Sequence, residues 1–171
     1  QTINHIVELD YMKRGSTLFL KVVILLISII AFVGMIRFPQ TEGRATNLDL
    51  ISIYQDPFII YIYIASIPFF VVLYQSFKLL GYVDKNKIFS QASVKSISII
   101  KYCAIAIVAF IVAAEGYLFI FLRSKSDDIA GGVAMGLFII FVSVVIATAA
   151  AIFQKLLQNA VDIKSENDLT V

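Results

Sequence analysis

Long apolar stretches alternate with short polar ones along this chain. Four windows, at about residues 18–38, 58–80, 98–122 and 130–157, carry few charged residues. A helix needs about 20 mostly apolar residues to cross the hydrocarbon core of a bilayer, and each window reaches this length. Backbone groups in lipid must find partners within their own segment, which favours helices over open strands. The pattern predicts an all-α integral membrane protein, a four-helix transmembrane bundle of the up-and-down type.

Composition agrees with this assignment. The chain is 60% hydrophobic over 171 residues, with a mean hydropathy of +0.89, whereas a soluble domain has about 45 to 50% apolar residues. The formal net charge of +2 hides a segregation, because charged residues gather between the windows. The expected environment is therefore the lipid bilayer, and no direct contact with nucleic acid is expected.

The distribution of cations predicts the orientation. Cytoplasmic segments of membrane proteins carry an excess of Lys and Arg. Ten of the fourteen cations fall on the side of the two termini, and the other four are Arg37, Arg44, Arg123 and Lys125. We therefore expect both termini in the cytoplasm. Lys21 and Lys101 lie just inside their windows, where long side chains can reach the headgroups and act as anchors.

Local signals mark where the inner helices begin. In Asp56-Pro57, the aspartate can cap a helix and the proline suits its first position. Either Ser90 or Ser93 can cap the third helix in the same way. Pro68 lies near the middle of the second window, where the loss of a backbone donor predicts a kink.

The first residues are read differently from the rest. Met12-Lys13-Arg14 resembles a natural start, so residues 1–11 are interpreted as an extension or a cloning remnant. Residues 12–171 are expected to form a single four-span domain with a C-terminal tail.

Three stretches resemble the DUF2975 family of small bacterial four-helix membrane proteins. They are the start M-K-R-G-S-T-L-F-L-K (residues 12–21), the step K-I-F-S (residues 87–90) and the tail K-S-E-N-D-L-T-V (residues 164–171). The likeness covers residues 12–171, and its motifs are compositional rather than catalytic. It implies a multi-pass protein of the bacterial cytoplasmic (inner) membrane. It also implies a partner, because members are often encoded beside a small helix-turn-helix regulator.

Glu115 is the carboxylate that lies deepest within a window, about 7 to 8 Å from the middle of the third helix. A charge at such a depth costs on the order of 3 kcal/mol and marks a functional candidate. Arg37, Tyr61 and Tyr63 lie at a similar depth on the first two windows. Three interpretations stay open: a structural Glu115–Arg37 bridge or hydrogen-bond network, a ligand or ion site, and an exposed carboxylate in an outer vestibule.

Small residues follow one face of the fourth window. Gly132 and Gly136 form a G-x-x-x-G step, and Ser143, Ala147 and Ala151 extend it. Such a stripe lets helix backbones approach closely. The partner is either another helix of the same bundle or a second copy in a homo-oligomer.

The fourth window continues into an amphipathic tail. Leu156, Leu157 and Val161 are apolar among charged and amide side chains, and Asp168 lies near the end. This segment either docks a partner helix, packs against the cytoplasmic loop or lies in the lipid interface.

Catalytic chemistry is not expected. His5 is the one histidine and Cys103 the one cysteine, so the chain has neither a Ser-His-Asp set nor a cluster of metal-binding residues. We expect no enzyme activity, no cofactor and no metal. The leading hypothesis is a sensing or regulatory membrane protein that acts through its cytoplasmic loop (residues 81–95) and tail (residues 155–171). The alternative is a small transporter or channel component with a polar site near Glu115, and a purely structural or stress-protective role is a third.

Overall fold

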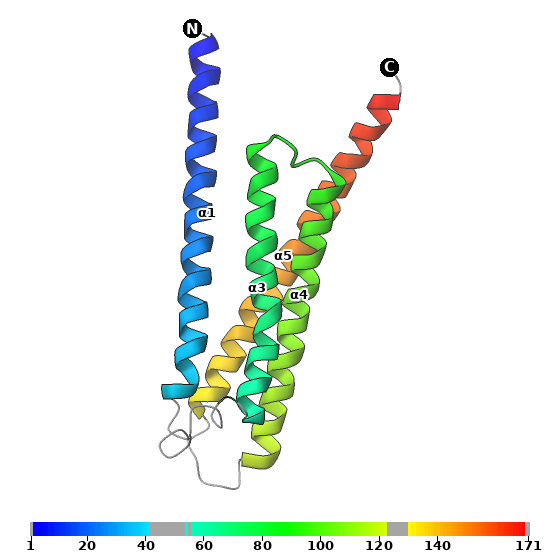
Figure 1. Ribbon diagram of the computed structural model, residues 1–171. Coiled ribbons are helices and arrows are strands. Elements are labelled where there is room, and N and C mark those ends of the chain that lie inside the picture. The colour runs from blue at the N-terminus through cyan, green and yellow to red at the C-terminus, as the bar shows by residue number, and fades with distance from the viewer. Residues whose placement is uncertain (1, 42–53, 55, 123–129, 170–171) are drawn as a thin grey trace.

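Four long helices make up most of the described part of the chain (Figure 1). The computed structural model describes residues 2–41, 54, 56–122 and 130–169, and side chains within 15–40, 54, 56–120 and 130–167. The helices are α1 (Thr2–Thr41), α3 (Pro57–Asp84), α4 (Gln91–Tyr117) and α5 (Ala130–Leu169), and α4 continues as the π-helix η2 (Leu118–Leu122). Each of the four contains a span that is long and apolar enough to cross a membrane. The predicted all-α, four-helix membrane fold is confirmed.

The helices run beyond the apolar windows. α5 continues to Leu169, well past the window that ends at about residue 157, and α1 begins at Thr2. Hydropathy marks only the part of a helix that lies in hydrocarbon, whereas helical hydrogen bonding can continue outside it. Residues 2–11 therefore prolong the first span as helix, whatever their origin.

The predicted helix starts are confirmed at both inner helices. The Asp56 carboxylate accepts a hydrogen bond of 2.7 Å from the Phe58 amide, and Pro57 takes the first helical position. Ser90, rather than Ser93, caps α4, and its hydroxyl accepts from the Ser93 amide at 3.4 Å. These side chains satisfy backbone donors that a helix start leaves unpaired. Pro68 lies inside α3, which is continuous across it.

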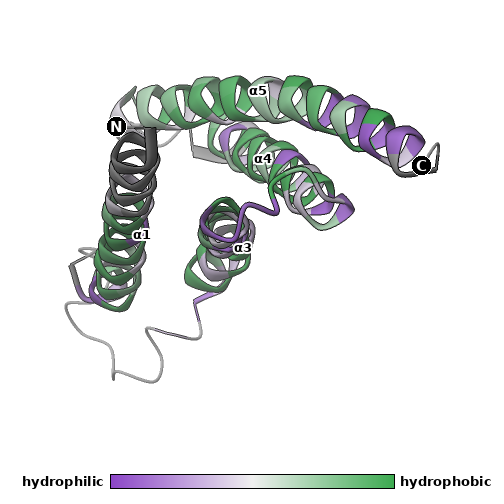
Figure 2. Ribbon diagram, turned by 90° about the horizontal axis from the view of Figure 1, so that it is seen from above, coloured by the Kyte–Doolittle hydropathy of each residue, from purple (hydrophilic) through white to green (hydrophobic). Residues whose placement is uncertain are grey.

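The two ends of the bundle differ in what they contain. Both termini and the α3–α4 turn lie at one end, called here the terminal end (Figure 1). The opposite end, where α1 stops and α3 and α5 begin, is called the distal end. Each helix packs chiefly on its neighbour in sequence: α1 on α3, α3 on α4, and α4 on α5, where the contact is most extensive. Seen from above, α5 crosses α4 obliquely (Figure 2).

Residues spaced seven apart form the seam of α5 with α4. Gly136, Ser143 and Ala150 are buried along α5, and Leu157 continues the series. A seven-residue spacing keeps one face of a helix turned toward its partner, as in coiled coils. The largest apolar cluster in the described part of the chain lies at the terminal end of this seam and joins Ala150 and Leu157 to Val94 and Ile97.

A second series with the same spacing turns α3 toward α1. Tyr63, Phe70, Phe77 and Asp84 each contact α1 through a hydrogen bond, a ring contact or an ion pair. None of the hydropathic window of α1 is buried. α1 is therefore attached by a line of specific contacts rather than by an apolar core.

Candidate functional site

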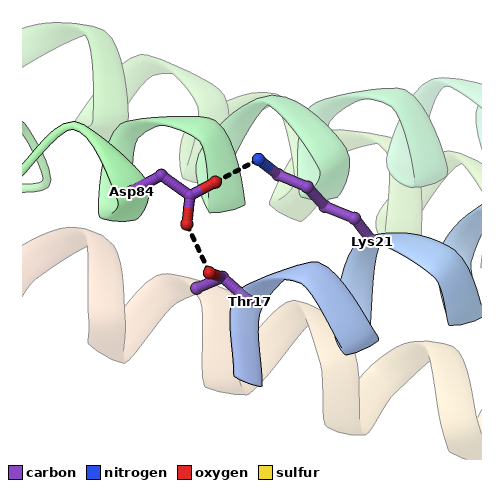
Figure 3. Close-up of polar contacts among 3 residues, drawn as sticks. All are labelled: Thr17, Lys21 and Asp84. Atoms are coloured by element: carbon purple, nitrogen blue, oxygen red, sulfur yellow. Dashed lines mark hydrogen bonds and ion pairs between the residues drawn. The ribbon is translucent and has the colours of Figure 1, made fainter. Parts of the chain in front are cut away.

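A polar clasp joins α1 to the end of α3 (Figure 3). The Asp84 carboxylate accepts a hydrogen bond from the Thr17 hydroxyl and forms an ion pair with the Lys21 ammonium group. Asp84 is the last residue of α3, where the helix dipole disfavours an anion, so the cation of Lys21 offsets an unfavourable position. Only about a quarter of each charged side chain is exposed. We call Thr17, Lys21 and Asp84 the α1 clasp.

The sequence alone did not reveal this clasp. Lys21 was interpreted as an anchor to the headgroups, but its ammonium group pairs with Asp84 and lies 5.7 Å from the centre of the Phe77 ring. A usable signal did exist. Thr17 and Lys21 are four residues apart on one helical face, and an acidic residue ends the neighbouring span at the same side of the membrane.

Lys101 makes a similar link between α4 and α5. Its ammonium group donates to the Gln154 side-chain oxygen at 2.8 Å and lies 4.5 Å from the centre of the Tyr102 ring. Both lysines that the sequence placed inside the windows thus bind side chains of a neighbouring helix. Their ammonium groups cross-link the bundle near its terminal end.

Glu115 lies at the distal end, lodged against α5. A methyl group built on Gly136 would overlap its Oε1 atom and come within 2.8 Å of its carboxyl carbon. The glycine thus leaves a notch that the carboxyl group fills. Oε2 of Glu115 is buried and, within the described residues, has no hydrogen-bond partner. A buried polar atom without a partner is uncommon in native proteins and makes this carboxyl group a candidate for function.

Among the described residues, those predicted to lie around Glu115 make separate contacts. Tyr61 donates its hydroxyl hydrogen to the Phe110 carbonyl, and Tyr63 donates to the Met35 carbonyl at 3.0 Å. Within the described part of the chain no ion pair joins Glu115 to Arg37, an exposed residue of α1 that makes other contacts. The two tyrosine hydroxyls thus satisfy backbone carbonyls of neighbouring helices, α4 and α1.

A pocket of about 420 Å³ lies next to this region but does not contain the carboxyl group. It is lined by Pro57, Phe58, Tyr61, Ala113, Ala114, Tyr117 and Leu118. Glu115 points to α5, whereas the pocket lies between α3 and α4. This pocket is therefore not a polar vestibule around Glu115.

The small residues predicted to line one face of α5 differ in how far they are buried. Gly136 and Ser143 are buried, Ala147 is half-buried, and Gly132 and Ala151 are exposed. A Cβ atom on Gly132 would meet open space. A four-residue step advances 400° around the helix, so a stripe at that spacing drifts by about 40° per step away from the seam. This drift explains why Ala150 replaces Ala151 on the buried face.

An apolar groove opens at the terminal end, and we call it the terminal groove. It has a volume of about 580 Å³. Helices α3, α4 and α5 and the α3–α4 turn contribute its lining, which is Leu79, Ile88, Phe89, Ile97, Ile100, Ile146, Ala150, Phe153, Leu156 and Leu157.

The residues predicted to contact a partner divide between the core and the surface. Leu157 is 9% exposed and Val161 packs against the same cluster, so both serve packing within the chain. Leu156 is 59% exposed. The side chain of Asp168 lies outside those described. From Asp162 to Asn167 every side chain is exposed, and we call residues 162–167 the α5 arm.

Metal chemistry finds no support among the described residues, where no group of three His, Cys, Asp or Glu side chains comes together. Cys103 is a free, half-buried thiol. The side chain of His5 lies outside the described ones.

Comparison with known proteins gives two findings. The family described as "Protein of unknown function (DUF2975)" matches residues 39–171. A protein of Bacillus subtilis (strain 168), "Uncharacterized membrane protein YoaS", is 46% identical over 162 residues, which cover 94% of this chain and 100% of the relative. No solved structure matches the chain.

Proposed function

This chain belongs to the DUF2975 family, and on that premise we propose that it is a non-enzymatic membrane protein of sensing or regulatory type that binds a partner protein at its terminal end. The observation that carries the proposal is the α5 arm. α5 remains helical after Val161, which packs against the terminal cluster, and every side chain from Asp162 to Asn167 is exposed.

The arm has the properties of a docking helix. It is stabilised by its own contacts, because Gln158 donates to the Asp162 carboxylate at 2.7 Å and Ser165 donates to the Asp162 carbonyl at 2.8 Å. Ile163, which is 61% exposed, gives it an apolar contact point among charged neighbours. A preformed helix loses little conformational freedom on binding, which favours recognition.

The proposed partner is the small helix-turn-helix regulator that the family resemblance implies. Such a regulator is cytoplasmic, which requires that the terminal end face the cytoplasm. The lysines of this end support that orientation. We place the protein in the bacterial inner membrane with both termini inside.

Topology can be measured with reporter fusions at residue 48 and at the C-terminus. Activity of a cytoplasmic reporter at the C-terminus, and of an external reporter at residue 48, is the expected result. The reverse pattern would exclude a cytoplasmic partner at the arm.

Partner binding can be measured by two-hybrid complementation between the full chain and a small helix-turn-helix regulator of the kind that the family resemblance implies. We expect Ile163→Glu to lower the signal strongly, because an interface hot spot contributes about 2 kcal/mol, or about 30-fold in affinity. Gln91→Glu, a change at an exposed residue of the same end, is the matched control and should leave the signal unchanged. Equal signals from the wild type and from a chain ending at Val161 would sink the proposal.

Transport through a site at Glu115 is the second candidate function, and the unpartnered Oε2 atom is the observation that favours it. A transport path also needs a polar or water-filled route, because charged groups in the membrane line cavities or pair with one another. The nearby pocket is lined mostly by apolar residues and excludes Glu115. Uptake or efflux that is lost in Glu115→Gln, with partner binding intact, would shift the function to transport.

A further inference from the structure

The terminal groove has one chemical character throughout. All ten lining side chains are aliphatic or aromatic. Side chains of α3, α4, α5 and the turn residues Ile88 and Phe89 line the groove. Among these helices, α4 lies between α3 and α5 (Figure 2). With no polar side chain among its lining residues, the groove can select hydrocarbon and little else.

Its dimensions suit a single hydrocarbon chain. The lining residues of α5 run from Ile146 to Leu157, which corresponds to a length of about 16 Å at 1.5 Å per residue. The groove is therefore long and apolar, and an extended hydrocarbon chain can follow it along α5.

The mouth of the groove is basic. Lys85 and Lys87 lie in the α3–α4 turn, both exposed, and Lys87 directly precedes the lining residues Ile88 and Phe89. This turn joins two membrane-crossing helices, so it lies at the level where lipid headgroups begin. Lysines at this level attract anionic headgroups.

From these observations we propose that the terminal groove binds one acyl chain of an anionic phospholipid, whose headgroup lies beside Lys85 and Lys87. A chain that moves from the bilayer into the groove exchanges one apolar environment for another, so its retention depends on close packing and on the headgroup charge. The site is separate from the α5 arm and stands whether or not the arm binds a regulator.

The test is native mass spectrometry of the full chain released from detergent with equimolar phosphatidylglycerol and phosphatidylcholine. We expect one retained phosphatidylglycerol per chain. Ile146→Trp fills the groove from its rim and should lower retention about tenfold, whereas Val145→Trp, at an exposed neighbour outside the lining, should not. Lys85→Glu with Lys87→Glu should abolish the preference for phosphatidylglycerol, whereas Lys95→Glu, exposed on the first turn of α4, should preserve it.

Equal retention of phosphatidylglycerol in the two tryptophan variants would overturn the proposal. The same holds if all three lysine substitutions alter the preference for phosphatidylglycerol to the same extent. Circular dichroism and thermal unfolding of each variant show that a loss of lipid is not a loss of fold. A photo-crosslinker at position 146 gives an independent readout. Labelling of phospholipid supports the site, whereas labelling of a protein or of a second copy in place of lipid overturns it.

Discussion

The α4–α5 seam and the α1–α3 seam join neighbouring helices in opposite ways. Along α4–α5, small and apolar residues are buried at regular spacing, and an apolar cluster closes the terminal end. Along α1–α3, no residue of the hydropathic window of α1 is buried, and the contacts are separate. They include the α1 clasp, an edge-on contact of the Phe32 and Phe70 rings at 6.5 Å, and the hydrogen bond from Tyr63 to Met35.

This contrast separates two sources of stability in a membrane. Lipid is as apolar as a leucine side chain, so helices gain little from merely hiding apolar surface. The α4–α5 seam depends on close packing. A substitution that makes a side chain of this seam larger or smaller disturbs the packing. The α1–α3 seam depends on directional polar bonds, each of modest strength. Mutations in the first seam should therefore unfold the protein, whereas mutations in the second should loosen α1 alone.

The largest effect is expected from Leu157→Ala. It creates a cavity in the terminal apolar cluster and should lower the free energy of unfolding by about 3 kcal/mol, as core truncations do. Leu156→Ala, at an adjacent exposed position, should cost far less. Reversible unfolding in mixed micelles measures both. Similar losses at the two positions would mean that the cluster is not a packed core.

Next in size is Gly136→Leu, which should cost about 2 kcal/mol because the new side chain overlaps Glu115. Gly132→Leu enters open space and should be close to neutral within one chain. Combining Gly136→Ala with Glu115→Ala should recover much of the loss that Gly136→Ala causes alone. A Gly132→Leu variant that shifts the oligomer distribution would place a second copy on that face.

Asp84→Asn should have a smaller effect, about 1 kcal/mol, because the ion pair is partly exposed. Lys21→Met removes the same ion pair as Asp84→Asn. The double variant should therefore lose less free energy of unfolding than the sum of the two single variants. Lys78→Met is the control, since Lys78 lies over the Tyr82 ring instead. The measurement is the rate at which a thiol reagent labels a cysteine introduced on α1. The substitution Cys103→Ser removes the natural cysteine first. Additive costs would show that the clasp is not a coupled unit.

The smallest effect is expected from Tyr63→Phe, which deletes one hydrogen bond to a backbone carbonyl of α1. Single polar contacts between membrane helices contribute about 0.6 kcal/mol on average. Tyr74→Phe, at a position that is 63% exposed, serves as the control. A loss as large as that of Leu157→Ala would mean that α1 is integrated into the core after all.

Some of this arrangement was accessible from the sequence. The four spans follow from apolar length, and the helix starts follow from Asp56-Pro57 and from serine near residue 90, because caps depend only on local residues. Hydropathy says that a helix spans but not how it is rotated, since rotation is set by packing against neighbours. For that reason the seating of Glu115 on Gly136 and the pairing of Lys21 with Asp84 were missed. Residues spaced seven apart line both seams, and this spacing indicates which faces of α3 and α5 pack on their neighbours.

The notch at Gly136 has a mechanical consequence for the α4–α5 pair. The carboxyl group of Glu115 fits where a Cβ atom would be, so it acts as a key that fixes the axial register of the two helices. A slide of α5 by about one turn, 5.4 Å, that brings Ile140 into the place of Gly136 would set this carboxyl group against a side chain. The distal end of the seam therefore sets where along its length α5 meets α4, and with that how far the α5 arm projects.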